Sequence, residues 1–318
     1  MLQDMPLDEL RTYAGTNPKP DDFDGYWTTA LAELESTPSR PELTPADFTS
    51  PQALCFDLTF TGVGGARVHA KLLKPKGVTS GAPAIVAFHG YSASAYDWYT
   101  YLGWAGAGFV VAALDCRGQG GKSEDTGGVL GNTLHGHIIR GLDDAPEKLL
   151  YRSIFLDTVR MTRIVIDLDE VDPTRVGATG GSQGGGLSLA CASLEPRIKR
   201  CAPIMPFLSD YQRVWELDLA KNAYQEIQDY FRRFDPTHAR EREVFTRLGY
   251  IDVHHLSPRI TAETLMLTGL MDNVCPPSTQ FAAYNAISAP KEMVIYPDFG
   301  HEVFPGRDDR IFTFMQEL

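Results

Sequence analysis

A serine flanked by glycines is the clearest candidate for chemistry in this sequence. Residues 180–184 read Gly-Gly-Ser-Gln-Gly, between an apolar run at 176–178 and a helical pattern formed by Leu187, Ala190 and Leu194. A sharp turn between strand and helix exposes such a serine hydroxyl, and the glycines permit close backbone approach. The helix amino terminus behind Ser182 also favours developing negative charge. The context therefore predicts Ser182 as the nucleophile of an acyl transfer.

A serine nucleophile needs a base, and the base needs a carboxylate that holds it in the right tautomer. After a serine on such a turn, these groups follow in the order acid, then histidine. The apolar run 264–267 leads into Asp272, and the run 293–295 leads into His301. Asp298 is a rival acid, but its place three residues before His301 makes the required side-on geometry harder to reach. We predict the triad Ser182, Asp272 and His301.

The oxyanion formed during acyl transfer needs preset N–H donors. One expected donor is the backbone N–H of Gln183, directly after the nucleophile. The loop after the apolar run 82–88 supplies the second candidate, the backbone N–H of Tyr91. Both donors would lie at strand ends, close to the proposed serine.

The elements around these residues indicate an α/β protein. Short apolar runs at 82–88, 109–114, 176–178, 264–267 and 293–295 alternate with helical patterns, as expected for a mostly parallel sheet with helices on both faces. Residues 54–73 predict antiparallel strands. The stretch 207–255 is helical and too long for a plain connection, so we interpret it as a lid-like insertion over the active site. Residues 1–318 are expected to form a single domain.

Composition excludes several classes of function. Lysine and arginine total 29 against 41 acidic residues, a net charge of −12 that disfavours binding to nucleic acid. No apolar stretch is long enough to predict a membrane span. The amino-terminal sequence MLQDMPLDELRTY is acidic where an export signal is basic, and the five scattered cysteines lack a CxxC spacing. We therefore expect a cytoplasmic protein with reduced thiols.

No cofactor is expected. The pairs His135 with His137 and His254 with His255 lack the helical spacing and nearby third ligand of a zinc site. Residues 118–123 (GQGGKS) imitate a phosphate-binding loop, but Cys116 stands where its first glycine should be. The sequence thus predicts neither a metal site nor a nucleotide site.

Three motifs resemble those of a known family: Arg-Gly-Gln-Gly at 117–120, Gly-Gly-Ser-Gln-Gly at 180–184, and His301-Glu302. Further similarities are MPLDEL at 5–10, PDDFDGYW at 20–27 and APIMP at 202–206. Together they resemble the acetyl xylan esterase and cephalosporin C deacetylase family, carbohydrate esterase family 7 of the α/β-hydrolase superfamily. The resemblance spans essentially the whole chain.

The resemblance implies an α/β-hydrolase fold and a cytoplasmic deacetylase that acts on short acetylated xylo-oligosaccharides and on cephalosporin C. It implies the same triad and oxyanion donors, a residue at Phe207 that closes the acetyl pocket, and no metal. Arg117 and Gln119 match the family motif and are expected to support the site. The family also implies a hexamer, a trimer of dimers. We expect the loop 123–137 and the insertion to tune substrate choice.

Three other functions stay open. A general short-chain carboxylesterase would use the same triad. A serine peptidase of the prolyl-oligopeptidase kind would also use it, but normally needs a large additional domain. A non-catalytic binding protein would be expected to have lost a triad residue, and all three are present.

Overall fold

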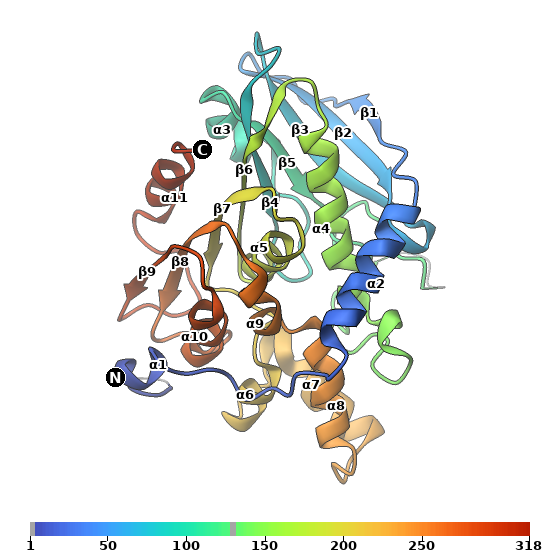
Figure 1. Cartoon of the computed structure of the whole chain (residues 1–318), viewed down its shortest axis with the longest axis vertical. Coiled ribbons are helices and arrows are strands. Elements are labelled where there is room, and N and C mark those ends of the chain that lie inside the picture. The colour runs from blue at the N-terminus through green and yellow to red at the C-terminus, as the bar shows by residue number, and fades with distance from the viewer. Residues whose placement is uncertain (1–3, 128–131) are drawn as a thin grey trace.

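One mostly parallel sheet organises the protein. The computed structural model describes residues 4–127 and 132–318, and within them nine strands follow the order β1-β2-β3-β5-β4-β6-β7-β8-β9 (Figure 1). Strands β4 to β9 run parallel, whereas β1, β2 and β3 form an antiparallel edge. The strands are β1 (Glu42–Pro45), β2 (Ala53–Thr61), β3 (Arg67–Pro75), β4 (Ala82–Phe88), β5 (Val110–Leu114), β6 (Val171–Gly181), β7 (Ile198–Ile204), β8 (Glu263–Gly269) and β9 (Lys291–Tyr296).

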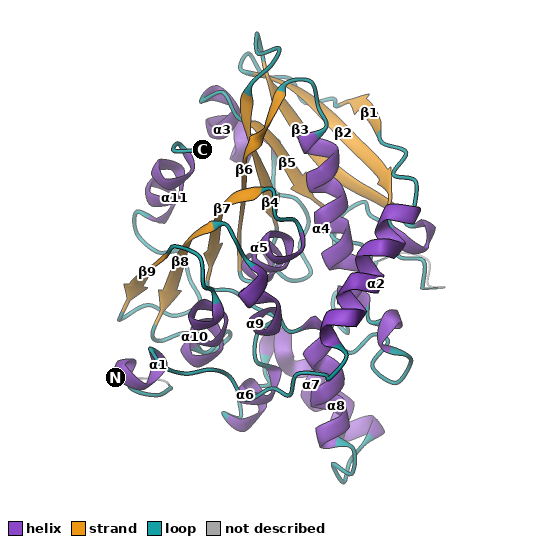
Figure 2. Ribbon diagram, viewed as in Figure 1, coloured by secondary structure: helices purple, strands orange, loops and turns teal. Residues whose placement is uncertain are grey.

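Helices cover both faces of this sheet, as predicted (Figure 2). On one face, Trp27 stacks on Phe155 with ring centroids 5.8 Å apart, which ties α2 (Phe23–Ser36) to α4 (Leu150–Ile166). On the other face, Trp104 lies 5.0 Å from Phe312 and joins α3 (Leu102–Gly106) to α11 (Arg307–Met315). Two apolar cores result, one on each side of the sheet. No helix in the described ranges is long and apolar enough to cross a membrane.

Two strands were not predicted from the sequence. Strand β7 reads IKRCAPI and lies in the middle of the sheet, between β6 and β8. Its charged residues Lys199 and Arg200 break the apolar run, and Pro203 normally argues against a central strand. Here Pro203 pairs with Gly180 near the end of the strand, where β7 leaves the sheet. Strand β1 is short and fully exposed, so it carries no apolar pattern.

The segment between β7 and β8 is helical, as expected. It contains α6 (Tyr211–Glu216), α7 (Gln225–Phe234), α8 (Glu241–Leu248) and α9 (Val253–Leu256). In Figure 1 these helices lie at the end of the sheet toward which the arrows of β8 and β9 point. Active sites of α/β sheets form at this carboxyl end of the parallel strands. We call residues 207–255 the helical insertion.

A buried carboxylate fastens the start of the insertion to the amino-terminal part of the chain. Asp210 accepts hydrogen bonds from the Tyr13 hydroxyl at 2.7 Å and from the N–H groups of Thr16 and Asn17 at 3.0 and 2.8 Å. Its own N–H donates to Asp252 Oδ1 at 3.0 Å. The pKa of Asp210 is raised, and burial of its carboxyl group is the main cause. Residues more than 190 positions apart in the chain therefore share one polar cluster.

Candidate active site

Ser182 occupies a strained turn between β6 and α5 (Gln183–Leu194). Its backbone has φ 56° and ψ −119°, a combination that side-chain-bearing residues rarely adopt. The neighbouring residues must be glycine because there is no room for a side chain. A Cβ atom at position 180 would lie 2.6 Å from the carbonyl oxygen of Phe88, and one at position 184 would lie 2.1 Å from the same oxygen. Strand β4 thus packs against the turn through backbone alone, and the turn presents the serine at the strand end.

The structure brings the three predicted triad side chains into one chain of hydrogen bonds. His301 Nε2 lies 3.0 Å from Ser182 Oγ, and His301 Nδ1 lies 2.8 Å from Asp272 Oδ2. Because an ionised carboxylate only accepts, Nδ1 carries the proton and Nε2 presents its lone pair to the serine. This is the tautomer in which His301 can take a proton from Ser182.

The surroundings of Asp272 fix its carboxylate. The residue is fully buried. Its Oδ1 accepts from the N–H groups of Val274 and Cys275, both at 2.8 Å, and its Oδ2 accepts from Gln280 Nε2 at 3.3 Å as well as from His301. These donors compensate for burial of the carboxylate and hold it toward the imidazole. The rival acid Asp298 is exposed, and Nδ1 of His301 bonds Asp272 instead.

A buried amide pair holds Gln183, the residue after the nucleophile. Gln119 Nε2 donates to Gln183 Oε1 at 2.9 Å, and Gln183 Nε2 donates back to Gln119 Oε1 at 3.1 Å. Gln183 Oε1 also accepts from the Tyr151 hydroxyl at 2.6 Å, and Gln119 Oε1 accepts from the N–H of Ser92 at 3.0 Å. Gln119 therefore links the loop after β4 to the nucleophile turn. Tyr151, on α4, carried no local signal in the sequence.

Aromatic side chains pack together where the helical insertion begins. The N–H of Phe207 donates to the carbonyl oxygen of Ser182 at 3.0 Å, which places the start of the helical insertion against the turn. The Phe207 ring is fully buried, with centroids 5.6 Å from Tyr91 and 4.2 Å from Tyr224. Phe207 and Tyr91, both predicted as site residues, are thus in contact. Tyr224 was not predicted.

Arg117 belongs to the scaffold behind the site. Its Nε and Nη2 atoms bond the two carboxylate oxygens of Asp157 on α4, each at 2.7 Å, and Nη1 donates to the carbonyl of Val63 at 3.1 Å. Both charged side chains are almost fully buried. The pair fastens the loop after β5 to α4, so the support it gives to the site is indirect.

Breaking this buried ion pair is expected to destabilise the protein strongly. Arg117→Leu leaves Asp157 buried without its partner, and the free energy of unfolding should fall by about 3–5 kcal/mol. Denaturant unfolding followed by tryptophan fluorescence measures the change. The double variant Arg117→Leu/Asp157→Leu removes both charges and should recover a large part of the loss. A single variant as stable as the wild type would contradict the assigned role.

Among the residues that the structure describes, two groups of side chains bring possible metal-ligating atoms within 4.8 Å of one another: Asp252, His254 and His255, and Asp272, Cys275 and His301. The first group corrects the expectation that His254 and His255 lack a third ligand nearby. However, His254 Nδ1 lies 2.7 Å from Asp252 Oδ1, and this pair supports the polar cluster at Asp210. In the second group, Asp272 and His301 are already bonded to each other. We therefore assign no metal to either group.

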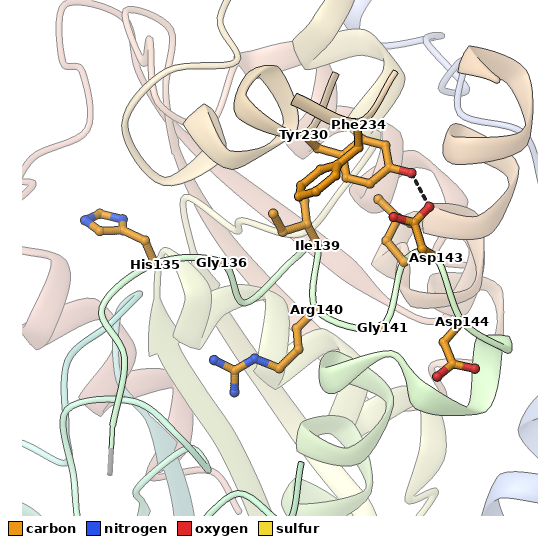
Figure 3. A pocket seen from close by; sticks show the side chains of 10 residues that line it. His135, Gly136, Ile139, Arg140, Gly141, Asp143, Asp144, Tyr230 and Phe234 are labelled. Carbon is orange, nitrogen blue, oxygen red and sulfur yellow. Dashed lines mark hydrogen bonds between the residues drawn. The ribbon is translucent and has the colours of Figure 1, made fainter. Parts of the chain in front are cut away.

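A groove runs along the outside of the insertion (Figure 3). Residues 135–136 and 139–144, together with Tyr230 and Phe234 of helix α7, line its volume of about 560 Å³. At one end the Tyr230 hydroxyl donates to Asp143 Oδ1 at 2.5 Å, and the Phe234 ring nearby is exposed. Residues 128–131 of the predicted selectivity loop 123–137 lie outside the described residues, so the role of that loop stays a prediction.

Known proteins resemble this chain over its whole length. The family model described as acetyl xylan esterase matches residues 1–318. The solved structure of acetyl xylan esterase 1 from Thermoanaerobacterium sp. JW/SL YS485 shares 58% identity over 99% of both chains, with a TM-score of 0.96. An acetyl xylan esterase from Paenibacillus sp. R4 shares 36% identity over 98% of this chain and 99% of that one, with a TM-score of 0.93.

More distant matches show the fold. A dipeptidyl aminopeptidase IV from Bacteroides ovatus, itself described as putative, aligns at 18% identity over 84% of this chain and 36% of that chain, with a TM-score of 0.60. An acetyl esterase from Xylanibacter ruminicola is 28% identical over 284 residues, 87% of this chain. The chain spans 62% of the length of that curated relative. The predicted α/β-hydrolase fold is confirmed, and because the family model covers every residue, the chain belongs to the acetyl xylan esterase family.

Proposed function

We propose that this protein is a serine esterase that removes acetyl groups from small acetylated substrates. The observation that carries the proposal is the continuous hydrogen-bonded path from Asp272 through His301 to Ser182 Oγ. Membership of the acetyl xylan esterase family supports the acetyl group as the acyl part of the substrate.

The proposed reaction follows from this path. Ser182 Oγ attacks the acetyl carbonyl while His301 Nε2 takes its proton, and Asp272 stabilises the resulting imidazolium. The N–H groups of Tyr91 and Gln183 stabilise the oxyanion. His301 then protonates the leaving alcohol, which departs and leaves an acetyl ester on Ser182. A water molecule, deprotonated by His301, attacks this ester, and acetate leaves as Ser182 regains its proton.

Several finer assignments belong to the same proposal. We propose acetylated xylo-oligosaccharides and cephalosporin C as substrates, and a hexameric trimer of dimers, which sedimentation analysis can test. We also propose one domain over residues 1–318, in which the helical insertion acts as a lid. All five cysteines are free and buried, which supports the proposed cytoplasmic location.

The acyl pocket gives a testable preference. The rings of Tyr91, Phe207 and Tyr224 pack together, and the backbone of Phe207 bonds that of Ser182. We propose that these rings narrow the acyl pocket, so we expect kcat/KM on p-nitrophenyl esters to fall steeply from acetate to butyrate. Each methylene that the pocket rejects is worth about 10- to 200-fold. A flat profile would instead indicate a general short-chain carboxylesterase, and cleavage of a peptide anilide in preference to the esters would indicate a peptidase.

Phe207→Leu is expected to relax this preference. The smaller side chain opens space beside the serine, and the ratio of kcat/KM for acetate to that for butyrate should fall by about tenfold. Phe231→Leu is a matched control, because Phe231 is equally buried in the insertion but packs on Trp215 and Phe245. An unchanged ratio in Phe207→Leu, or an equal change in the control, would contradict the pocket role.

A further inference from the structure

Glu226 is a buried carboxylate that the proposed reaction does not use directly. It projects from α7 of the helical insertion and is 5% exposed. Its Oε1 accepts a hydrogen bond from the Tyr91 hydroxyl, and its Oε2 accepts from the N–H groups of Ile138 and Ile139 at 2.7 and 3.0 Å. One side chain of the insertion therefore binds both the loop that carries Tyr91 and the segment that follows residue 137.

The second of these segments is fastened to α7 at two points. Besides the two bonds to Glu226, the Tyr230 hydroxyl donates to Asp143, the interaction drawn in Figure 3. Arg240 adds a bond to the same carboxylate at 2.9 Å. Helix α7 and the Ile138–Asp143 segment thus form one connected body, and the Tyr91 hydroxyl is attached to it.

The Tyr91 hydroxyl supplies the proton in its contact with Glu226. Burial, followed by the nearby charge of Glu226, raises the pKa of the Tyr91 hydroxyl, so the phenol keeps its proton and donates. Burial also raises the pKa of Glu226, whereas its three donors act in the opposite direction. The three donors together hold the carboxyl group of Glu226 in one geometry.

The two proposed oxyanion donors are held in different ways. Gln183 is fixed by Gln119 and Tyr151, which belong to the loop after β5 and to α4. Tyr91 is fixed at its side chain by Glu226, which belongs to the insertion. Its ring also packs on Phe207, at the start of the same insertion. The geometry of one donor therefore depends on a segment outside the strands and helices that hold the other.

We propose that Glu226 is a positioning residue of the oxyanion hole, which holds the Tyr91 loop through the tyrosine hydroxyl so that the Tyr91 N–H points at the reacting carbonyl oxygen. The inference rests on the proposed esterase function and extends it. The helical insertion then contributes to the chemical step, in addition to any part it has in admitting substrate.

Two single variants test the contact from its two ends. Tyr91→Phe removes only the hydroxyl. Glu226→Gln keeps an oxygen for Ile138 and Ile139 but turns an amide donor toward Tyr91. With p-nitrophenyl acetate as substrate, each variant should lower kcat by about tenfold and change KM by less than about twofold. This loss is smaller than the roughly 10²- to 10³-fold fall in kcat that follows removal of an oxyanion-hole donor itself. Because both act on one contact, the double variant should be no more than about twofold worse than the poorer single variant.

Inhibition by methylboronic acid separates positioning from a purely structural effect. The boronate adds to Ser182 and places a negative oxygen in the hole, so its Ki should rise by about the same factor as kcat falls. Asp229→Asn makes the same chemical change on the same helix, one turn beyond Glu226, and should behave like the wild type. Wild-type kcat and Ki in both test variants, or losses confined to KM or to the unfolding midpoint, would overturn the inference. A wild-type protein inactive on acetyl esters would overturn the proposed function and this inference with it.

Discussion

Ser182→Ala is expected to lower kcat for p-nitrophenyl acetate by about 10⁵- to 10⁶-fold, because every covalent step of the proposed reaction passes through its hydroxyl. The remaining rate would come from the oxyanion donors and from substrate binding. The fold should survive, since the turn is held by the backbone bonds of residue 182 to Ile204 and Phe207. Labelling by a fluorophosphonate probe should disappear together with the activity.

The matched control is Ser193→Ala. Ser193 lies on α5 and bonds the carbonyl of Leu189 at 2.7 Å, a contact within the helix that has no part in the proposed chemistry. This variant should keep its rate within about twofold, because the lost hydroxyl bonds only a carbonyl of its own helix. If Ser182→Ala retained the esterase rate, or if both serine variants lost it equally, the nucleophile would have to be sought elsewhere.

Asp272→Asn is expected to lower kcat by about 10⁴-fold. The asparagine oxygen can still accept from Val274 and Cys275, which directs its amide group toward His301. The imidazole Nδ1 must then accept a hydrogen bond from this amide, and Nε2 becomes the protonated nitrogen. A protonated Nε2 donates to Ser182 and has no lone pair to take the serine proton. The loss should therefore appear in kcat, with circular dichroism unchanged.

The rival acid supplies the comparison for this experiment. Asp298→Asn changes an exposed side chain three residues from His301 and should leave kcat within about twofold. The reverse outcome, a large loss in Asp298→Asn with little effect at Asp272, would exchange the two assignments. Measurements of kcat on one acetyl ester at a single pH are sufficient, because the expected effects differ by orders of magnitude.

Much of the site could be predicted because its residues follow local patterns. Ser182, Asp272 and His301 each come after a strand with an apolar run, and parallel strands in one sheet end at the same edge. The glycines around Ser182 mark a turn that only small residues permit. Composition, strand runs and turn residues were therefore enough to place these three side chains together.

The supporting residues could not be found in the same way. Glu226 contacts Tyr91 across 135 positions, and Tyr151 contacts Gln183 across 32. A glutamate in an amphipathic helix and a tyrosine in an apolar one look like ordinary surface and core residues. Only the packing of the insertion against the loops shows that their polar atoms are buried and paired. Strand β7 was not predicted for a related reason. Its central place in the sheet follows from its pairing with β6 and β8 and is not visible in its own sequence pattern.

The long separations in this site also determine when the protein can begin to work as it is being synthesised. Asn17 is translated 193 residues ahead of its partner Asp210, and Ser182 is translated 119 residues ahead of His301. At translation speeds of about 5–20 residues per second, the latter interval lasts roughly 6–24 s. Throughout that time the growing chain carries the serine turn without its base. Esterase activity should consequently appear only after residue 301 has been synthesised, and ribosome-bound chains that stop before residue 301 should have none.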